Sequence, residues 1–270
     1  MRVRIASEPA PGQAVNEDAA IHLGSLVGVF DGVTAPVGID TGCIHGPAWY
    51  VQRLTARLAQ VAEAQPAASL SVMLAEAIER VRRDHDGSCD LGNPATPAAT
   101  VCLLRADDRH AEYLILADCT LVIDGADGVS ALTDQRFGDA VARLRREALA
   151  KGGSEVPAGT PVPGKYALTN QPDGYWIAAA NPEAARQAVT GVLDLHGATR
   201  VRRAALLTDG ASRAVDDFGL MGWQDLLDIL TEDGPTELIR RVREAEDTAK
   251  QPRYKRHDDA TAVLCTFGSG

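Results

Sequence analysis

Acidic residues recur at the ends of apolar stretches, and this spacing is the feature most able to support chemistry. Asp31, Asp118 and Asp209 each follow a short apolar run, and a glycine comes directly after Asp31 and Asp209. Two acidic pairs, Glu17-Asp18 and Asp258-Asp259, stand instead before such runs. A buried strand that ends in aspartate holds the carboxylate on a rigid support at the rim of a sheet. If the strands are neighbours, their ends bring several carboxylates together.

Carboxylates placed this close together cannot all remain ionised without a compensating cation. An all-oxygen, anionic set of ligands selects hard divalent ions such as Mg²⁺ or Mn²⁺. The simpler interpretation of any one Asp-Gly pair after a strand is a turn. For the whole set at matching strand ends, metal binding explains the pattern better than turn formation alone.

The overall composition is that of an acidic globular protein. The chain has 270 residues, with 24 aspartates, 13 glutamates and a formal net charge of −10. The 45% hydrophobic and 24% charged residues argue against a disordered or fibrous chain. The acidic balance disfavours binding to nucleic acid or to an anionic membrane through bulk charge. We therefore expect neither of these partners, and the sequence gives no indication of the oligomeric state.

The cysteines are scattered and odd in number. None of the five belongs to a Cys-x-x-Cys pair; they are Cys43, Cys89, Cys102, Cys119 and Cys265. This pattern predicts reduced thiols in a cytoplasmic protein rather than a disulfide framework, and it disfavours structural zinc. No apolar run is long enough for a signal peptide or a membrane span.

Hydrophobic periodicity predicts the scaffold that must position the carboxylates. We expect strands over 20–30 (two strands with a turn at Gly24-Ser25), 99–105, 112–118, 120–124, 175–179, 204–207 and 260–267. Helical spacing indicates helices around 49–61, 70–81, 137–149, 223–230 and 238–245, and a short one opened by Pro182. Strands in runs and helices in pairs favour an α+β fold with one domain over 1–270. The Gly/Pro-rich segment at about 151–170 is expected to be a mobile surface loop.

These motifs together resemble the metal-dependent protein Ser/Thr phosphatases of type 2C (the PPM family). The matches run through nearly the whole chain in family order: Asn16-Glu17-Asp18-Ala19, Val29-Phe30-Asp31-Gly32, Ala99-Thr100-Val101, Leu116-Ala117-Asp118-Cys119, Leu207-Thr208-Asp209-Gly210 and His257-Asp258-Asp259-Ala260-Thr261. Each motif alone is weakly specific, but the ordered set is strong. The resemblance implies a four-layer α-β-β-α sandwich of two antiparallel sheets flanked by helices.

The resemblance also implies a binuclear metal site. Asp31 would bridge two Mg²⁺ or Mn²⁺ ions, and Asp209 and Asp258 would complete the ligands of the first. The Gly32 carbonyl would bind the second ion, with its waters oriented by Glu17 and Asp18. Asp118 would hold a third, weaker ion. A water between the metals would attack phosphorus, so Asp31 and Asp18 count as catalytic as well as metal-binding residues.

Two departures from the family pattern concern phosphate capture. The family often has an arginine four residues before the glutamate, where this chain has Gln13. After Asp-Gly it often has Met-Gly-Gly or His-Gly-Gly, where this chain has 33–36, Val-Thr-Ala-Pro. Arg213 is a candidate substitute clamp, with a surface role as the alternative. His45 is a candidate proton donor to the leaving group, with helix capping or packing as the alternative.

We predict a cytoplasmic phosphatase that hydrolyses phosphoserine and phosphothreonine in proteins, using two metal ions and a third at Asp118. Two alternatives remain open. One is a catalytically weak or silent member that binds a phosphorylated partner as a regulator, which the missing arginine favours. The other is a phosphatase of small phosphate esters.

Overall fold

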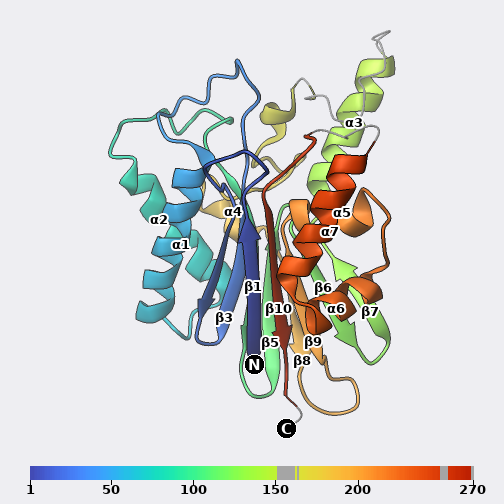
Figure 1. Ribbon diagram of the computed structural model, residues 1–270. Coiled ribbons are helices and arrows are strands. Elements are labelled where there is room, and N and C mark those ends of the chain that lie inside the picture. The colour runs from blue at the N-terminus through green and yellow to red at the C-terminus, as the bar shows by residue number, and fades with distance from the viewer. Residues whose placement is uncertain (151–161, 163, 250–254, 269–270) are drawn as a thin grey trace.

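The computed structural model describes residues 1–150, 162, 164–249 and 255–268, and within them the strands form two five-stranded sheets (Figure 1). One sheet has the order β1 (Arg2–Glu8), β10 (Ala260–Thr266), β9 (Arg203–Leu207), β6 (Thr120–Gly125) and β7 (Gly128–Leu132). The other has the order β2 (Ala19–Leu23), β3 (Leu26–Gly32), β4 (Ala99–Ala106), β5 (His110–Leu116) and β8 (Val189–Asp194). All neighbouring strands are antiparallel.

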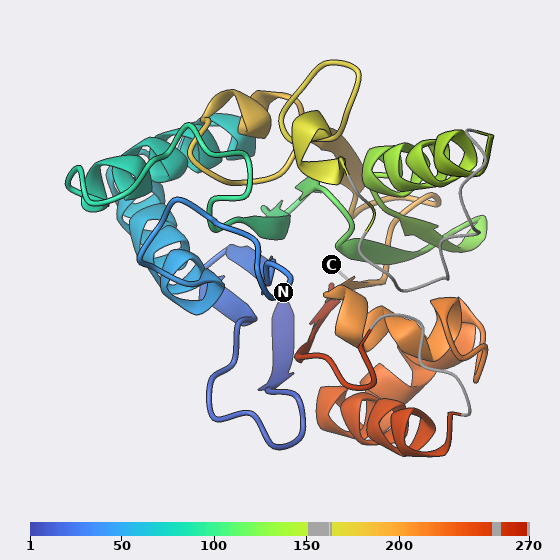
Figure 2. The ribbon, with the colours of Figure 1, turned by 90° about the horizontal axis from the view of Figure 1, so that it is seen from above.

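Helices cover the outer face of each sheet (Figures 1 and 2). The β2–β8 sheet is covered by α1 (Pro47–Ala64) and α2 (Leu70–Asp84), and the short α4 (Glu183–Arg186) packs against α2. The β1–β7 sheet is covered by α5 (Asp209–Asp216), α6 (Trp223–Glu232) and α7 (Pro235–Thr248). Helix α3 (Arg136–Ala150) and the short 3₁₀ helix η1 (Lys165–Leu168) contact each other. None of the described helices combines the length and apolar character needed to cross a bilayer.

The hydrophobic core lies in three layers, one between the two sheets and one under each helical layer. Strands β4, β9 and β10 are buried on both faces, because one face meets the opposite sheet and the other meets helices. This explains why they appear in the sequence as continuous apolar runs rather than alternating ones. Burial on this scale is the dominant favourable contribution to folding.

The predicted α-β-β-α sandwich is confirmed, as are the helical faces under α1 and α2. Leu54, Leu58 and Val61 of α1 are fully buried. The apolar face predicted for α2 is also buried: Leu70, Met73, Leu74, Ala77, Ile78 and Val81. The N-cap Ser69 accepts a hydrogen bond from the Val72 N–H at 3.4 Å, so α2 begins where the apolar periodicity starts. The predicted hairpin turn at Gly24 is also confirmed, with φ of +62°.

The strand expected over 175–179 does not form. The segment makes two isolated bridges, from Ala178 to Ala99 and from Tyr175 to Thr169, and packs as a buried irregular stretch. Most of the predicted mobile loop, residues 151–161 and 163, lies outside the described residues. From Gly164 onward the chain forms η1, whose side chains reach the pocket described below.

Antiparallel pairing explains how the motif carboxylates meet. Because β2 and β3 are antiparallel, the start of β2 lies beside the end of β3, with Ala19 opposite Phe30. In the other sheet the end of β9 lies beside the starts of β6 and β10, since Leu207 faces both Thr120 and Ala262. The two sheets pack face to face, so all these strand ends gather at one end of the sandwich.

Candidate metal centre

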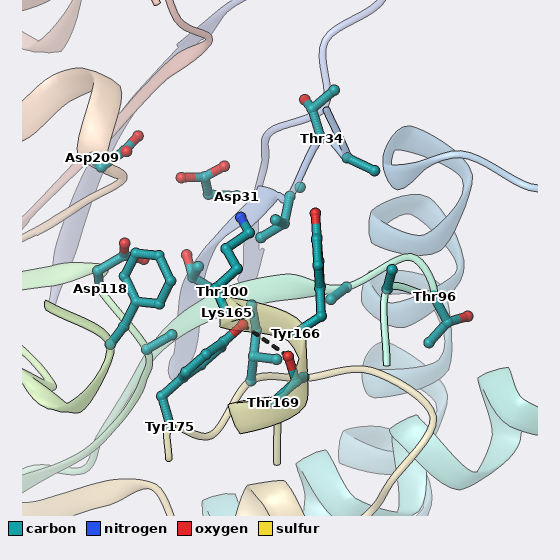
Figure 3. A pocket seen from close by; sticks show the side chains of 18 of the residues that line it. Asp31, Thr34, Thr96, Thr100, Asp118, Lys165, Tyr166, Thr169, Tyr175 and Asp209 are labelled. Atoms are coloured by element: carbon teal, nitrogen blue, oxygen red, sulfur yellow. Dashed lines mark hydrogen bonds between the residues drawn. The ribbon is translucent and has the colours of Figure 1, made fainter. Parts of the chain in front are cut away.

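Carboxylates from four separate segments line one pocket at this end of the sandwich (Figure 3). Asp31 comes from β3, Asp118 from the β5–β6 connection, Asp209 from the first turn of α5, and Asp258 from the residues before β10. We call this the acidic pocket. In Figure 3 the carboxylates of Asp31, Asp118 and Asp209 surround a common space, towards which Lys165 extends from η1. Further residues of the pocket lining are Thr34, Phe137, Tyr166, Thr169, Tyr175 and Ile177.

Burial and mutual repulsion raise the pKa values of three of the pocket carboxyl groups, those of Asp31, Asp118 and Asp209. Burial raises the pKa of Asp31 well above its ordinary value, and repulsion from Asp209, Asp18 and Asp118 adds to the effect. Burial, followed by repulsion from Asp258 and Asp118, raises the pKa of Asp209 to about 7. The pKa of Asp118 is raised mainly by burial. At neutral pH such a group of oxygens must hold either protons or a cation.

Two lysines supply positive charge to the acidic pocket. The Lys255 ammonium donates to Asp258 Oδ1 at 3.0 Å and to Thr34 Oγ1 at 3.3 Å. Burial opposes its charged form, but attraction to Asp258, Asp31 and Asp209 outweighs burial and raises its pKa. Burial lowers the pKa of Lys165 despite attraction to Asp118. Both lysines line the acidic pocket.

A second layer of carboxylates holds the acidic pocket in shape. Asp259 accepts the backbone N–H of Ala10 at 2.7 Å and that of Glu17 at 2.5 Å. Asp18 is 6% exposed and accepts the Thr208 hydroxyl at 2.8 Å. Burial raises the pKa of Asp18 well above its ordinary value, against the lowering effect of the Thr208 hydrogen bond. These contacts tie the N-terminal segment to the strand ends that carry Asp209 and Asp258.

Glycines follow two of the pocket aspartates because the backbone is crowded there. A Cβ on Gly32 would lie 2.7 Å from the Glu17 carbonyl oxygen. A Cβ on Gly210 would lie 1.8 Å from the Asp259 carbonyl oxygen. Any side chain at either position would push apart the segments that bring the carboxylates together.

Ala117, directly before Asp118, has a left-handed backbone with φ of +64°. A residue with a Cβ pays an energetic cost in this region. The Ala117 carbonyl accepts the backbone N–H of Asp134 at 3.3 Å, which helps to hold the turn. The strained turn directs Asp118 into the acidic pocket beyond the end of β5.

The structure brings most of the sequence-predicted metal ligands together. Asp31, Gly32, Asp118, Asp209 and Asp258 all line the acidic pocket. Asp18 lies behind its lining and acts electrostatically on Asp31. Glu17 is half-buried outside the lining and accepts a hydrogen bond from the Thr34 hydroxyl. Gln13, which stands at the family's arginine position, is exposed.

Arg213 does not fit the predicted role of phosphate clamp. Arg213 is 7% exposed, and its guanidinium donates to Glu246 at 2.6 Å, to Asp217 at 3.3 Å and to the Lys255 carbonyl at 3.0 Å. It does not line the acidic pocket. Freeing Arg213 for a substrate would remove one of the two arginines that pair with the buried Glu246 carboxylate, the other being Arg243. Arg213 instead supports the segment that carries Lys255 and Asp258.

His45 does not fit the predicted role of general acid. It is absent from the lining of the acidic pocket, and its ring stacks on Trp49 with centroids 3.8 Å apart. Its Nδ1 lies 3.5 Å from the Sγ atoms of both Cys43 and Cys89. The expectation of scattered thiols is wrong for these two cysteines, whose Sγ atoms are 2.7 Å apart.

Sequence reasoning missed Lys165 and Lys255 as pocket residues. Lys255 stands three positions before Asp258, next to Arg256. Its position close to a motif aspartate is a signal that could have found it. Lys165 follows the Gly/Pro-rich segment, and nothing local indicates that its side chain turns inward.

No known family profile and no curated sequence relative matches this chain. Solved structures do match, and they define the fold as that of bacterial PPM Ser/Thr phosphatases over the full length of the chain. A bacterial serine phosphatase aligns with a TM-score of 0.63 at 13% identity, covering 100% of this chain and 99% of the other. The PPM Ser-Thr phosphatase MsPP from Mycobacterium smegmatis, in complex with cacodylate, aligns with a TM-score of 0.59 at 18% identity, covering 99% of each chain.

The catalytic domain of the Ser/Thr phosphatase PstP, in complex with two manganese ions, aligns with a TM-score of 0.57 at 15% identity. The alignment covers 97% of this chain and 96% of that one. At these identities the comparison establishes the shared fold. The chemistry of this chain must be argued from its own residues.

Proposed function

We propose that this protein is a metal-dependent phosphatase that hydrolyses phosphoserine and phosphothreonine in proteins. The observation that carries the proposal is the set of half-buried carboxylates from four segments, placed at one end of a fold shared with Ser/Thr phosphatases. All-oxygen donors are the chemistry expected of a site for hard divalent ions. We treat residues 1–270 as a single catalytic domain that acts in the cytoplasm.

Four residues would hold two Mg²⁺ or Mn²⁺ ions: Asp31, Gly32 through its carbonyl, Asp209 and Asp258. Asp118 would hold a third. When bound, such ions supply an activated water and neutralise charge on phosphoryl oxygens. Asp18 and Asp259 fix the positions of the surrounding segments, and Glu17 with Thr34 orders the entrance to the acidic pocket.

Phosphate capture would fall to the two pocket lysines rather than to an arginine. Lys165 in η1 and Lys255 before β10 both line the acidic pocket. An ammonium group binds phosphoryl oxygens as a point charge. Displacement of Lys255 from Asp258 by an incoming metal ion would free its ammonium for the substrate. This arrangement accounts for the loss of the family arginine at Gln13.

The test is hydrolysis of an aryl phosphate and of phosphoserine, phosphothreonine and phosphotyrosine peptides, with Mn²⁺ or Mg²⁺ added. We expect Mn²⁺-stimulated turnover with the phosphoserine and phosphothreonine peptides. Asp31→Asn should lower kcat by about 10³-fold or more, because a bridging charge contributes several kcal/mol to the transition state. The matched control is Asp108→Asn, which removes an exposed aspartate and should leave turnover unchanged.

Equal turnover in wild type and Asp31→Asn would refute the proposal. Turnover confined to small phosphate esters, with none on peptides, would keep the metal chemistry and assign the smaller substrate class.

One observation favours the second candidate, a silent regulator. The Lys255 ammonium lies 3.0 Å from Asp258 Oδ1, so it can neutralise the acidic pocket without a metal ion. If that is its role, no added metal should support turnover, and calorimetry should detect no Mn²⁺ binding. Phosphopeptide binding should then persist in Asp31→Asn and weaken in Lys255→Met.

A further inference from the structure

A second group of metal-ligating side chains lies outside the acidic pocket. Cys43 and His45 belong to the connection between β3 and α1, and His85 and Cys89 follow the end of α2. One ligand atom from each of the four residues lies within 4.8 Å of all the others. We call these residues the Cys–His cluster. The sequence separates its two halves widely, so only the fold brings them together.

Two of the three distances between the ligand atoms of Cys43, His45 and Cys89 agree with tetrahedral coordination of a metal ion. Bonds of about 2.3 Å to sulfur and about 2.0 Å to nitrogen give sulfur–nitrogen edges of about 3.5 Å. His45 Nδ1 lies 3.5 Å from both Sγ atoms. The two Sγ atoms, 2.7 Å apart, would separate by about 1 Å on binding, because two zinc-bound sulfurs lie about 3.8 Å apart.

The environment of His85 is independent evidence for a metal ion at this cluster. Its side chain is only 3% exposed, and its Nδ1 lies 2.8 Å from the Val81 carbonyl oxygen. A carbonyl can only accept, so Nδ1 carries the proton and Nε2 carries the lone pair. Nε2 is buried without a hydrogen-bond partner. Metal-bound histidines characteristically donate their other N–H to a carbonyl in this way, whereas an unpartnered buried acceptor is costly.

The surrounding residues hold the two rings and the Cys43 sulfur in place. Trp49 stacks on His45 and meets His85 edge-on with ring centroids 4.7 Å apart. The backbone N–H of His45 donates to Cys43 Sγ at 3.4 Å. Burial raises the pKa of the Cys43 thiol to about 11, so an ion that binds there must displace the thiol proton.

The geometry points to a structural Zn²⁺ site formed by Cys43, His45, His85 and Cys89. Two thiolates and two imidazoles form a closed Cys₂His₂ set, which is typical of zinc that supports structure rather than catalysis. The soft sulfur donors disfavour Mg²⁺ and Mn²⁺, so the ion would differ from those of the acidic pocket. The cysteine spacing alone does not indicate this set, because Cys-x-His and His-x₃-Cys would supply the ligands in place of Cys-x-x-Cys.

The site would join two loops that also reach the acidic pocket. Backbone contacts already link these loops: the Asp90 N–H donates to the Gly42 carbonyl at 2.7 Å, and the Asn93 side chain donates to the Asp40 carbonyl at 3.0 Å. The loop of Cys43 begins with Val33-Thr34-Ala35, and the loop of Cys89 continues through 94–96. Both of those segments line the acidic pocket. A zinc ion in the Cys–His cluster would therefore stabilise one wall of the acidic pocket, although the ion itself would lie away from the carboxylates.

The experiment is elemental analysis of the full chain, purified with a reductant and without added metal. We expect about one zinc per chain and, after exchange, a cobalt form with thiolate-to-metal charge-transfer absorption. Cys43→Ala and Cys89→Ala should each lower the zinc content at least tenfold. Cys265→Ala, which removes a buried cysteine distant in sequence from the cluster, should retain it.

Several results would overturn the proposal. One is wild-type protein that is folded and reduced, yet contains no zinc and fails to bind added Zn²⁺ or Co²⁺ in a titration. Another is a Cys43–Cys89 disulfide in the zinc-free protein, found by mass spectrometry under the same reducing conditions. If the cysteine variants do not fold, the cobalt spectrum of the wild type still decides, because absence of the thiolate band excludes these ligands.

Discussion

The acidic pocket and the Cys–His cluster lie at opposite ends of one connection, the segment from β3 to α1. Asp31 and Thr34 are at its start, and Cys43 and His45 are near its end. The pocket offers oxygen donors, three of them with raised pKa values, and the ammonium groups of Lys165 and Lys255 as counter-charges. The cluster offers sulfur and nitrogen donors in a closed set held by aromatic rings. The two donor sets therefore suit different kinds of metal binding. The oxygen donors of the acidic pocket suit ions that exchange, and the sulfur and nitrogen donors of the Cys–His cluster suit an ion that stays bound.

The largest expected effect on stability comes from emptying the Cys–His cluster. The double variant Cys43→Ala/Cys89→Ala should lose about 3 kcal/mol of unfolding free energy, since a cross-link between distant segments typically contributes 2–4 kcal/mol. Chemical denaturation, compared with Cys265→Ala, measures this. Mn²⁺-dependent kcat per folded molecule should stay within about threefold of wild type. A loss of turnover as large as that of Asp31→Asn would mean that the two sites are not separable.

The acidic pocket should make the stability of the metal-free protein depend on pH. The raised pKa of Asp209, about 7, means that the folded metal-free protein holds a proton that the unfolded chain releases near pH 4. Its stabilising contribution is therefore complete below pH 4 and is lost as the pH rises to about 7. Denaturation of the metal-free protein between pH 5 and 7.5 should show stability falling by a few kcal/mol.

The same titration of Asp209→Asn should be flatter, because the amide has no proton to release. Mn²⁺ should stabilise the wild type more at pH 7 than at pH 5, since the ion competes with that proton. An equally steep pH dependence in the variant would assign the effect to other groups.

A Lys255 variant tests whether the pocket lysines bind the substrate or take the place of the metal ions. Lys255→Met should lower kcat/KM on an aryl phosphate by about ten- to a hundredfold, because a charge-assisted hydrogen bond contributes 1.5–3 kcal/mol. Arg256→Met, which removes the adjacent exposed cation, is the control and should change kcat/KM little. Higher turnover in Lys255→Met would instead show that the lysine competes with the metal ions.

The smallest effect concerns the backbone at Ala117. Replacing Ala117 with glycine removes the strain of its positive φ but also removes a buried methyl group, so stability should change by less than about 0.5 kcal/mol. Ala205→Gly, in the buried strand β9, should lose about 1–2 kcal/mol because no strain is relieved there. Chemical denaturation measures the unfolding free energy of both variants. Equal losses of unfolding free energy would contradict the role of backbone strain at Ala117.

The sequence was most informative where local pattern determines position. The aspartates at the ends of β3 and β9 could be placed because buried strands are visible as apolar runs, and antiparallel pairing brings such ends together. Strands β1, β7 and β8 were not predicted, because each lies at a sheet edge and alternates exposed, often polar residues with half-buried ones. Their pairing depends on neighbours that are distant in sequence.

The errors at the site have a common physical cause. Arg213 follows Asp209 by one helical turn, but its side chain leaves the pocket to pair with Glu246 on α7. His45 and Cys43 lie in a long connection, and their partner Cys89 is 46 positions away from Cys43. In each case a tertiary partner decides the role of the residue, and residue spacing in one chain does not contain that partner.

The position of β10 has a consequence for synthesis of the protein. Strand β10 lies between β1 and β9, and Asp258 and Asp259 directly precede it. During translation, β1 therefore has no partner strand in its own sheet until residues 260–266 have been made. The acidic pocket cannot assemble before that point, because Asp258 and the Asp259 carboxylate that accepts the Glu17 N–H arrive with that late strand. A chain that stops before β10 would lack an interior strand of its sheet together with one of the four pocket carboxylates.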